Sequence, residues 1–320
     1  DGKTVGEINY VVWSDVLISP FSGNEFVFYD VAVDKENGKV FEEFPCPDTG
    51  AILKKKQCSK ATIKFYDTYL NEEIETIKQQ PVLINYSITI HQGGKPKKAS
   101  YNKVPDKSDL NKIDKINETQ IPYWFPTNRM MEGKESRRND KVGITHVHHF
   151  FFKRSLFILS SIYKKCDEPI FKIWFTSQIV NLSKLNRFRP GVSFPYNPLS
   201  GTLYIGSQVS ESNVFQAYSN KIKKFIAAIS TVKSKNLVSI SSATSLSIPS
   251  NSIDYIFTDP PFGDNLMYSE LNFIWESWLK LTTVVDKEGI INSTQNKGLD
   301  DYNLLMLDSF KEYYRVLKPK

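Results

Sequence analysis

The sequence contains few cysteines, no long hydrophobic run and no glycine-rich turn of the G-x-G type. Only three of its 320 residues are cysteine, too few for a disulfide framework in a chain of this size. No stretch approaches the ~18 uninterrupted apolar residues that a membrane helix needs. Residues 1–4 carry neither the basic nor the apolar part of a secretory signal. We therefore expect a cytoplasmic protein that does not bind membranes.

Positive charge is concentrated in one part of the chain. The formal net charge is +6, while residues 170–253 alone contain nine bases and a single acid. Two further basic tracts occupy 95–115 and 129–141, and the second contains Arg137 and Arg138. Basic patches of this kind neutralise phosphates in nucleic-acid binding. A solvated basic face without a partner is the alternative interpretation.

Two knuckle-like sequences lie within a β-rich module expected over residues 1–90. They are Ser19–Gly23 and Cys46–Gly50, each with proline in the second place and glycine in the fifth. Strand, knuckle, hairpin, knuckle is the layout of a zinc ribbon, in which four cysteines hold one Zn²⁺. Only Cys46 occupies a ligand place as cysteine, because hydroxyl side chains fill the others. We expect a ribbon-shaped module that has lost its metal, or else two unrelated turns.

The rest of the chain divides into a polar, lysine-rich loop or insertion over 91–145 and a core region over 146–320. Apolar residues that recur at three and four predict helices over 150–163, 169–185, 214–229, 268–280 and 299–317. Runs of β-branched and aromatic residues predict strands over 8–12, 25–33, 39–44, 237–241 and 253–258.

The segment after residue 251 carries the clearest chemical signal. Ile253–Thr258 is nearly continuously apolar, as expected for a central strand of a parallel sheet, and it ends in Asp259-Pro260-Pro261-Phe262. Two prolines fix φ and remove two N–H donors, which leaves a turn rich in acceptors. Asp259 and the Pro260 carbonyl can accept both N–H groups of a flipped nucleobase amine while Phe262 stacks on the base. This arrangement predicts a site that positions an amine for attack on an electrophilic methyl group.

The tetrapeptide resembles the catalytic motif of S-adenosylmethionine-dependent amino-methyltransferases. The likeness continues through Tyr268–Leu271, Trp275–Trp278, Thr145–Phe151, Leu199–Tyr204 and the knuckles. Together these segments resemble the adenine-specific DNA methylases that contain a zinc-ribbon insertion. The resemblance implies an α/β fold with a Rossmann-like class I methyltransferase sheet, S-adenosylmethionine as cofactor and double-stranded DNA as substrate, as in restriction–modification. RNA remains an alternative substrate, because the amine site reads only the base.

The resemblance also assigns roles to residues. Asp259, Pro260, Pro261 and Phe262 form the catalytic site for the target amine, with aspartate in first place favouring adenine N6. Ser242, Ala243 and Thr244 lie where such enzymes contact the adenine of the cofactor. The residues expected to bind substrate are Asp264, Asn265, Tyr268, Arg137 and Arg138. Asp264 or Asn265 also fits the N-cap of the helix that follows.

The absence of a G-x-G turn limits which part of a methyltransferase this chain can provide. The relatives carry such a turn for the methionine part of the cofactor, so the resemblance implies that this chain is the middle of a longer protein and is inactive in isolation. The alternative is a non-catalytic DNA-binding or scaffolding component with a decayed methylase domain.

His146, His148 and His149 have no acid or cysteine near them in the sequence. We therefore expect them to pack or to contact phosphate, and we expect no metal.

Overall fold

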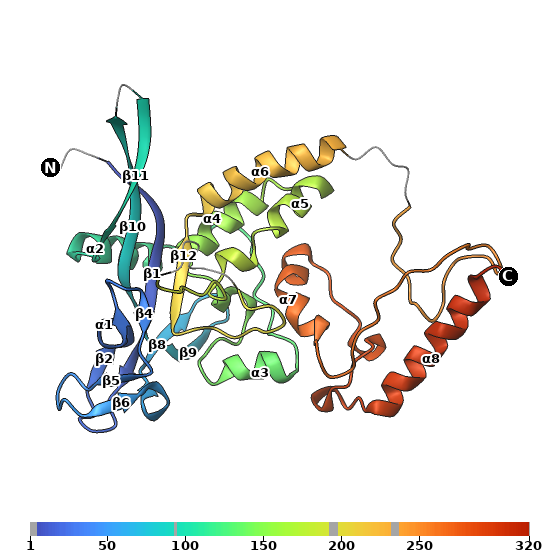
Figure 1. Cartoon of the computed structure of the whole chain (residues 1–320), viewed down its shortest axis with the longest axis horizontal. Helices are drawn as coiled ribbons and strands as arrows, with labels where there is room; N and C mark the ends of the chain where they lie inside the picture. The colour runs from blue at the N-terminus through green and yellow to red at the C-terminus, as the bar shows by residue number, and fades with distance from the viewer. Residues whose placement is uncertain (1–4, 93–94, 192–197, 232–236, 320) are drawn as a thin grey trace.

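The computed structural model describes residues 5–92, 95–191, 198–231 and 237–319, and its centre is an antiparallel sheet (Figure 1). The strands follow the order β11–β10–β1–β12, with bounds Lys95–Lys103, Gln79–Gln92, Glu7–Ile18 and Gln208–Ser212. Every neighbouring pair is antiparallel. Two short strands, β2 (Glu25–Val27) and β7 (Ser59–Lys60), also pair with the end of β1. The expected Rossmann-like parallel sheet is therefore wrong for the residues described.

Strand β1 is apolar along most of its length because both of its faces are covered. Val11 and Trp13 belong to the large core under the helices, while Val12 packs on the opposite face with Tyr29 and Val82. Alternate residues of a strand point to opposite faces, so this near-continuous run indicates burial on two sides. A nearly continuous apolar run, which we took as typical of a central strand in a parallel sheet, therefore also occurs in an antiparallel strand that is buried on both faces.

The knuckles lie together in a small β-rich module below the main sheet. Ser19 Oγ is 3.2 Å from Cys46 Sγ, and Ser22 Oγ donates a hydrogen bond of 2.6 Å to Asp48. Serine and threonine hydroxyls stay protonated at neutral pH and bind zinc poorly, so this donor set does not fit a zinc ion. A separate apolar cluster holds the module: Leu17, Phe26, Phe28, Ala32, Phe44, Cys46 and Leu53.

Secondary structure inside this module departs from the expected strands. Residues 25–33 form β2, a short helix α1 (Phe28–Ala32) and then β3 (Val33–Asp34), so the strand prediction fails in the middle. The remaining elements are short hairpin strands and one 3-10 turn: β4 Lys39–Val40, β5 Glu43–Pro45, β6 Ile52–Lys54, η1 Lys55–Gln57, β8 Thr62–Asp67 and β9 Glu72–Ile77. Residues 95–103, expected in a loop, form strand β11, which is paired to β10 over nine residue positions.

Helices α4, α5, α6 and α7 lie on the β12 side of the sheet and contribute to the large core (Figure 1). The helix bounds in this part of the chain are α2 Lys107–Glu118, α3 Lys134–Asp140, η2 Val147–Phe150, α4 Lys153–Tyr163, α5 Pro169–Thr176, η3 Val180–Leu182, α6 Val214–Thr231 and α7 Tyr268–Leu279. The helices predicted over 214–229 and 268–280 are confirmed. The one predicted over 169–185 ends at Thr176 and continues as a turn and η3. Among the described residues, no helix is both long and apolar enough to cross a membrane.

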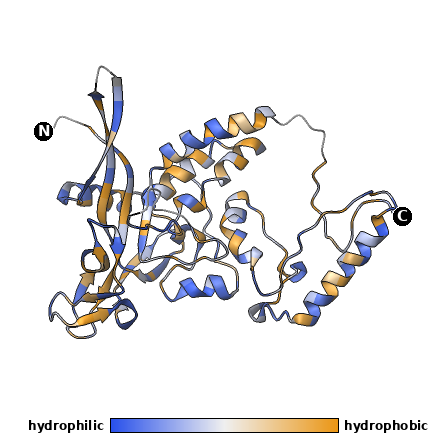
Figure 2. Ribbon diagram, in the orientation of Figure 1, coloured by the Kyte–Doolittle hydropathy of each residue, from blue (hydrophilic) through white to orange (hydrophobic). Residues whose placement is uncertain are grey.

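Residues 237–319 contain η4 (Val285–Lys287), η5 (Ser293–Gln295) and helix α8 (Leu299–Val316), which confirms the last predicted helix. The strands predicted over 237–241 and 253–258 are wrong, since within the described residues the only parallel contact of the second is one bridge between Ile253 and Leu317. Side chains that the pattern marks as buried are exposed here, including Ile240 and Phe257, at 101% and 85%. A strand of a parallel sheet needs paired neighbours along its length and helices over both faces. Among the described residues this segment has only the single bridge to Leu317, and its apolar side chains are exposed. Hydrophobic and hydrophilic residues alternate along α6 and α8 (Figure 2).

Candidate functional site

The turn Asp259–Phe262 is fixed along one side and open along the other. Tyr302 of α8 donates its hydroxyl to the Pro261 carbonyl at 2.7 Å, and the Ile291 N–H donates to the Gly263 carbonyl at 3.2 Å. The Phe262 ring is 69% exposed. Within the described part of the chain, no hydrogen bond engages the Asp259 carboxylate or the Pro260 carbonyl. The described residues therefore leave both acceptors without a hydrogen bond and most of the ring surface exposed.

The residues expected to contact the cofactor make a local turn. The hydroxyls of Ser242 and Thr244 are 2.8 Å apart, and Ser242 forms an isolated bridge with Ser245. No hydrogen bond between described residues joins Ser242, Ala243 or Thr244 to the Asp259–Phe262 turn. With no glycine-rich turn in the sequence, these residues do not fit an S-adenosylmethionine site.

Residues Asp264, Asn265 and Tyr268 follow the turn and lead into α7. Asp264 and Asn265 are exposed, and the Asn265 N–H donates to the Phe262 carbonyl at 3.2 Å. The N-cap position of α7 is Met267, and it lacks a side-chain cap. The alternative role of Asp264 or Asn265 as an N-cap is therefore wrong.

Arg137 and Arg138 on α3 are engaged in ion pairs within the protein. Arg137 pairs with Glu132 at 2.6 Å and with Asp140 at 2.7 Å. Arg138 pairs with Glu135 at 2.7 Å and donates to the Thr202 hydroxyl at 2.9 Å. The contact of Arg138 with Thr202 holds α3 against the loop that contains this threonine, whereas the Arg137 pairs lie within α3 and the residues just before it. A role in DNA binding would require both arginines to exchange ion-pair partners.

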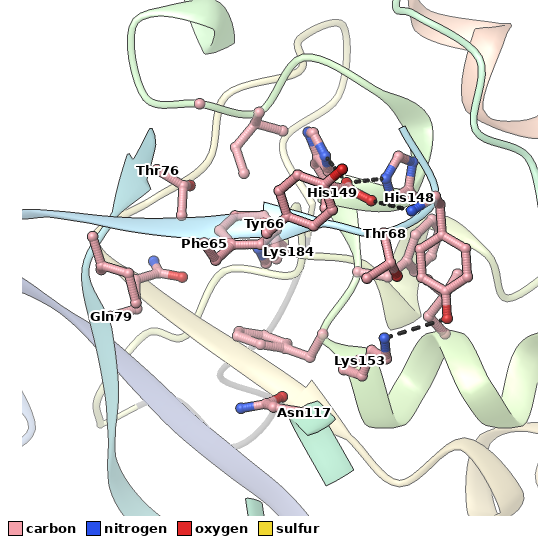
Figure 3. Close-up of a pocket in the computed structure, with 18 of the residues that line it drawn as sticks. Phe65, Tyr66, Thr68, Thr76, Gln79, Asn117, His148, His149, Lys153 and Lys184 are labelled. Carbon is pink, nitrogen blue, oxygen red and sulfur yellow. Dashed lines mark hydrogen bonds and ion pairs between the residues drawn. The ribbon is translucent and has the colours of Figure 1, made fainter. Parts of the chain in front are cut away.

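The structure brings together a different group of chemically active side chains, at Asp67, His148 and His149. Asp67 Oδ2 lies 2.8 Å from His148 Nε2 and 3.0 Å from His149 Nε2. All three side chains are buried. The two histidines lie side by side in the wall of a cavity (Figure 3). They belong to the 3-10 helix η2, where consecutive residues can face the same group.

Two segments position this cluster. Asp67 ends β8, and its Oδ1 accepts the N–H groups of Tyr69 and Leu70 at 2.9 and 3.3 Å, which fixes the carboxylate. The loop before the histidines is held against β9, because the N–H of Ile77 and the hydroxyl of Thr76 both donate to the Val142 carbonyl. Carboxylate and imidazoles therefore meet through backbone contacts between the β8–β9 hairpin and that loop.

The ionisation of the cluster follows from its burial and its hydrogen bonds. Burial by itself would raise the pKa of Asp67, but hydrogen bonds from His148 and His149 outweigh it and hold that pKa well below its ordinary range. Burial lowers the pKa of His149 to about 4, against the opposing hydrogen bond to Asp67. At neutral pH the cluster thus contains a carboxylate and, at His149, a neutral imidazole.

A cavity of about 770 Å³ lies beside the cluster and has a mixed lining. Lys153, Lys184 and Phe65 contribute to its wall (Figure 3). Burial lowers the pKa of Lys184 to about 8, although nearby Glu211 opposes the effect. Lys153 contacts the Tyr69 hydroxyl at 3.3 Å. In the described part of the chain neither lysine has an ion-pair partner, so both are available to an anionic ligand.

Sequence reasoning missed Asp67 because it lies 81 residues before His148. A search for acids or cysteines near the histidines along the chain cannot find it, since the antiparallel hairpin β8–β9 creates the contact. No local signal in the sequence marks Asp67 as a partner of the histidines.

Comparisons of this chain with models of protein families, with curated proteins and with solved structures found no match.

Proposed function

We propose that this chain provides the target-amine site of an adenine-N6 DNA methyltransferase. The observation that carries the proposal is the turn Asp259–Phe262, where a carboxylate and a carbonyl that have no hydrogen-bond partner among the described residues stand beside an exposed aromatic ring. Anchoring of the turn through Pro261 and Gly263 supports it as well, because amine recognition requires acceptors in fixed positions.

The chemistry of an extruded adenine matches this turn. Its exocyclic amine offers two N–H donors, which the Asp259 carboxylate and the Pro260 carbonyl can accept, and its flat ring can stack on Phe262. Base stacking on an aromatic side chain is worth about 1–3 kcal/mol. The basic excess of residues 170–253 supports binding to the phosphates of the same DNA.

S-adenosylmethionine is the methyl donor in this proposal. Because Ser242–Thr244 do not fit a site for it, we assign no step of the transfer to them. The chain's own contribution is to hold the amine and the base.

The proposal predicts that the chain distinguishes adenine from a purine that lacks the 6-amino group. Two thymine oligonucleotides, each with one adenine or one unsubstituted purine at the same place, differ only in that amine. We expect about tenfold tighter binding of the adenine strand, since a hydrogen bond to a charged acceptor is worth about 1.5–3 kcal/mol. Fluorescence anisotropy with both strands measures the ratio.

Substitutions test whether Asp259 causes the preference for the adenine strand. Asp259→Ala should remove it while leaving the affinity for the thymine tract nearly intact. Asp254→Ala is the matched control, because that exposed carboxylate lies five residues earlier and pairs with Lys318. Equal binding of the two strands by the unmodified chain, or a preference that survives Asp259→Ala, would contradict the proposal.

A further inference from the structure

The cluster of Asp67, His148 and His149 has the composition of a metal site. One ligand atom from each side chain lies within 4.8 Å of the other two, and all three residues are buried. Two imidazole nitrogens and one carboxylate oxygen are a donor set that zinc and related divalent ions prefer. We propose that these residues hold one divalent first-row transition-metal ion, with Zn²⁺ the best match.

The geometry requires little movement to accept the ion. Zinc lies about 2.0–2.2 Å from nitrogen and oxygen ligands in a tetrahedral site, which separates neighbouring ligand atoms by about 3.3 Å. Asp67 Oδ2 is now 2.8 and 3.0 Å from the two Nε2 atoms. An outward shift of the Asp67 carboxylate by a few tenths of an ångström therefore brings both of these distances to the required value, and the two Nε2 atoms lie within 4.8 Å of each other.

The surroundings fix the carboxylate but hold the His149 ring in the tautomer that donates to it. Two backbone N–H groups donate to the other oxygen of Asp67. His149 Nδ1 accepts the N–H groups of Thr145 and His146 at 3.3 and 3.4 Å. A metal bond at Nε2 therefore requires the proton to move to Nδ1 and the ring to turn until Nδ1 donates to the Thr145 hydroxyl, now 3.3 Å away. His148 Nδ1 is buried without a hydrogen-bond partner among the described residues.

The ion has room for further ligands. Asp67, His148 and His149 all line the cavity of about 770 Å³, so water or an anion can reach the remaining coordination position. Lys153 and Lys184 line the same cavity, and their charges favour an anionic exchangeable ligand. None of the described residues beyond Lys184 lines it, so the site is separate from the Asp259–Phe262 turn and independent of the function proposed for that turn.

His146 serves as the matched control, because it is a histidine of the same loop outside the cluster. Its Nδ1 is 2.8 Å from the Thr145 hydroxyl, and its ring centre is 5.3 and 5.9 Å from those of His149 and His148. Removal of His146 should leave metal binding unchanged, whereas removal of a ligand should weaken it.

The test is equilibrium dialysis of the whole chain against micromolar Zn²⁺, followed by metal analysis. We expect one ion per chain in the unmodified protein and in His146→Gln. Asp67→Asn and His148→Gln should lose at least about tenfold in affinity. Co²⁺ in place of Zn²⁺ identifies the donors, since tetrahedral Co²⁺ with nitrogen and oxygen ligands absorbs in the visible without the near-ultraviolet charge-transfer band of a thiolate ligand.

A second measurement applies if a ligand variant fails to fold. Zn²⁺ should then raise the melting temperature of the unmodified chain, and a chelator should reverse the rise. The proposal is overturned if the unmodified chain retains no metal after dialysis and shows no such shift. It is equally overturned if Asp67→Asn binds as tightly as the unmodified chain, or if the Co²⁺ spectrum shows thiolate ligands. In those cases the group is a hydrogen-bonded carboxylate–histidine cluster.

Discussion

Single residues with unusual backbone conformations decide whether the segments around the cavity can meet. Gly143 has φ of +72°, and a Cβ at this position would lie 2.0 Å from the Glu75 carbonyl oxygen of β9. We predict that Gly143→Ala lowers the free energy of unfolding by about 2 kcal/mol or more. The left-handed conformation accounts for about 1–2 kcal/mol of this, and the clash adds to it. Urea denaturation measures the difference.

Gly23 is the control for this prediction. Its φ of +73° is nearly identical, but a Cβ there would meet nothing within 4 Å. Gly23→Ala should therefore show only the conformational part of the loss. If both variants lose the same stability, close contact between β9 and the loop before the histidines does not contribute to folding.

At the scale of elements, helix α8 holds the segment that leads to the motif. Glu312 accepts the Leu246 N–H at 2.7 Å and pairs with Arg315, which also donates to the Ile248 carbonyl. The hydrogen bonds from Arg315, followed by the one from Leu246, lower the pKa of Glu312 from 4.5 to about 2. Because the pKa is lower in the folded protein, this stabilisation is complete above about pH 4.5 and is lost as the pH falls toward 2.

This linkage predicts pH-dependent protection of residues 246–253. Hydrogen exchange should be slower in the unmodified chain than in Glu312→Gln at pH 6, and the difference should shrink progressively between pH 4.5 and 2.5. Comparison of both proteins at each pH cancels the intrinsic pH dependence of exchange. Asp308→Asn, which removes an exposed ion pair of the same helix, should leave these amides unchanged. A difference that persists undiminished at pH 2.5 would show that Glu312 is not the titrating group.

The elements also show how much the sequence can predict. Helices α6, α7 and α8 were predictable to within two residues, because the amphipathic spacing of a helix is a local property. The segment 253–258 has the apolar composition of a strand but remains outside any described sheet, since strand pairing depends on partners that its own residues do not specify. Asp67 and His148 illustrate the same limit at the cavity, where a contact across 81 residues creates the cluster.

At the scale of the whole molecule, the large core includes α7 but makes little use of α8. Trp278 of α7 is fully buried, with ring centres 5.1 Å from Phe175 and 5.4 Å from Tyr163. In α8, by contrast, only Ser309 and Val316 are buried. Local stability follows buried apolar contact. The described residues on either side of α7, 237–266 and 281–319, should therefore open more easily than the body, although the first of these segments contains the motif of the proposed function.

This difference predicts which helices lose stability when a core residue is mutated. Trp278→Ala should lower the free energy of unfolding of the body by about 3–5 kcal/mol, and hydrogen exchange in α4 and α7 should accelerate accordingly. Exchange in α8 should be fast in both proteins and unchanged by the mutation, because α8 opens without the core. Trp124→Ala, at a site 44% exposed, should have a smaller effect on α4 and none on α8. Parallel loss of protection in α4 and α8 would mean instead that the two regions unfold as one cooperative unit, stabilised by contacts beyond the buried side chains of α8.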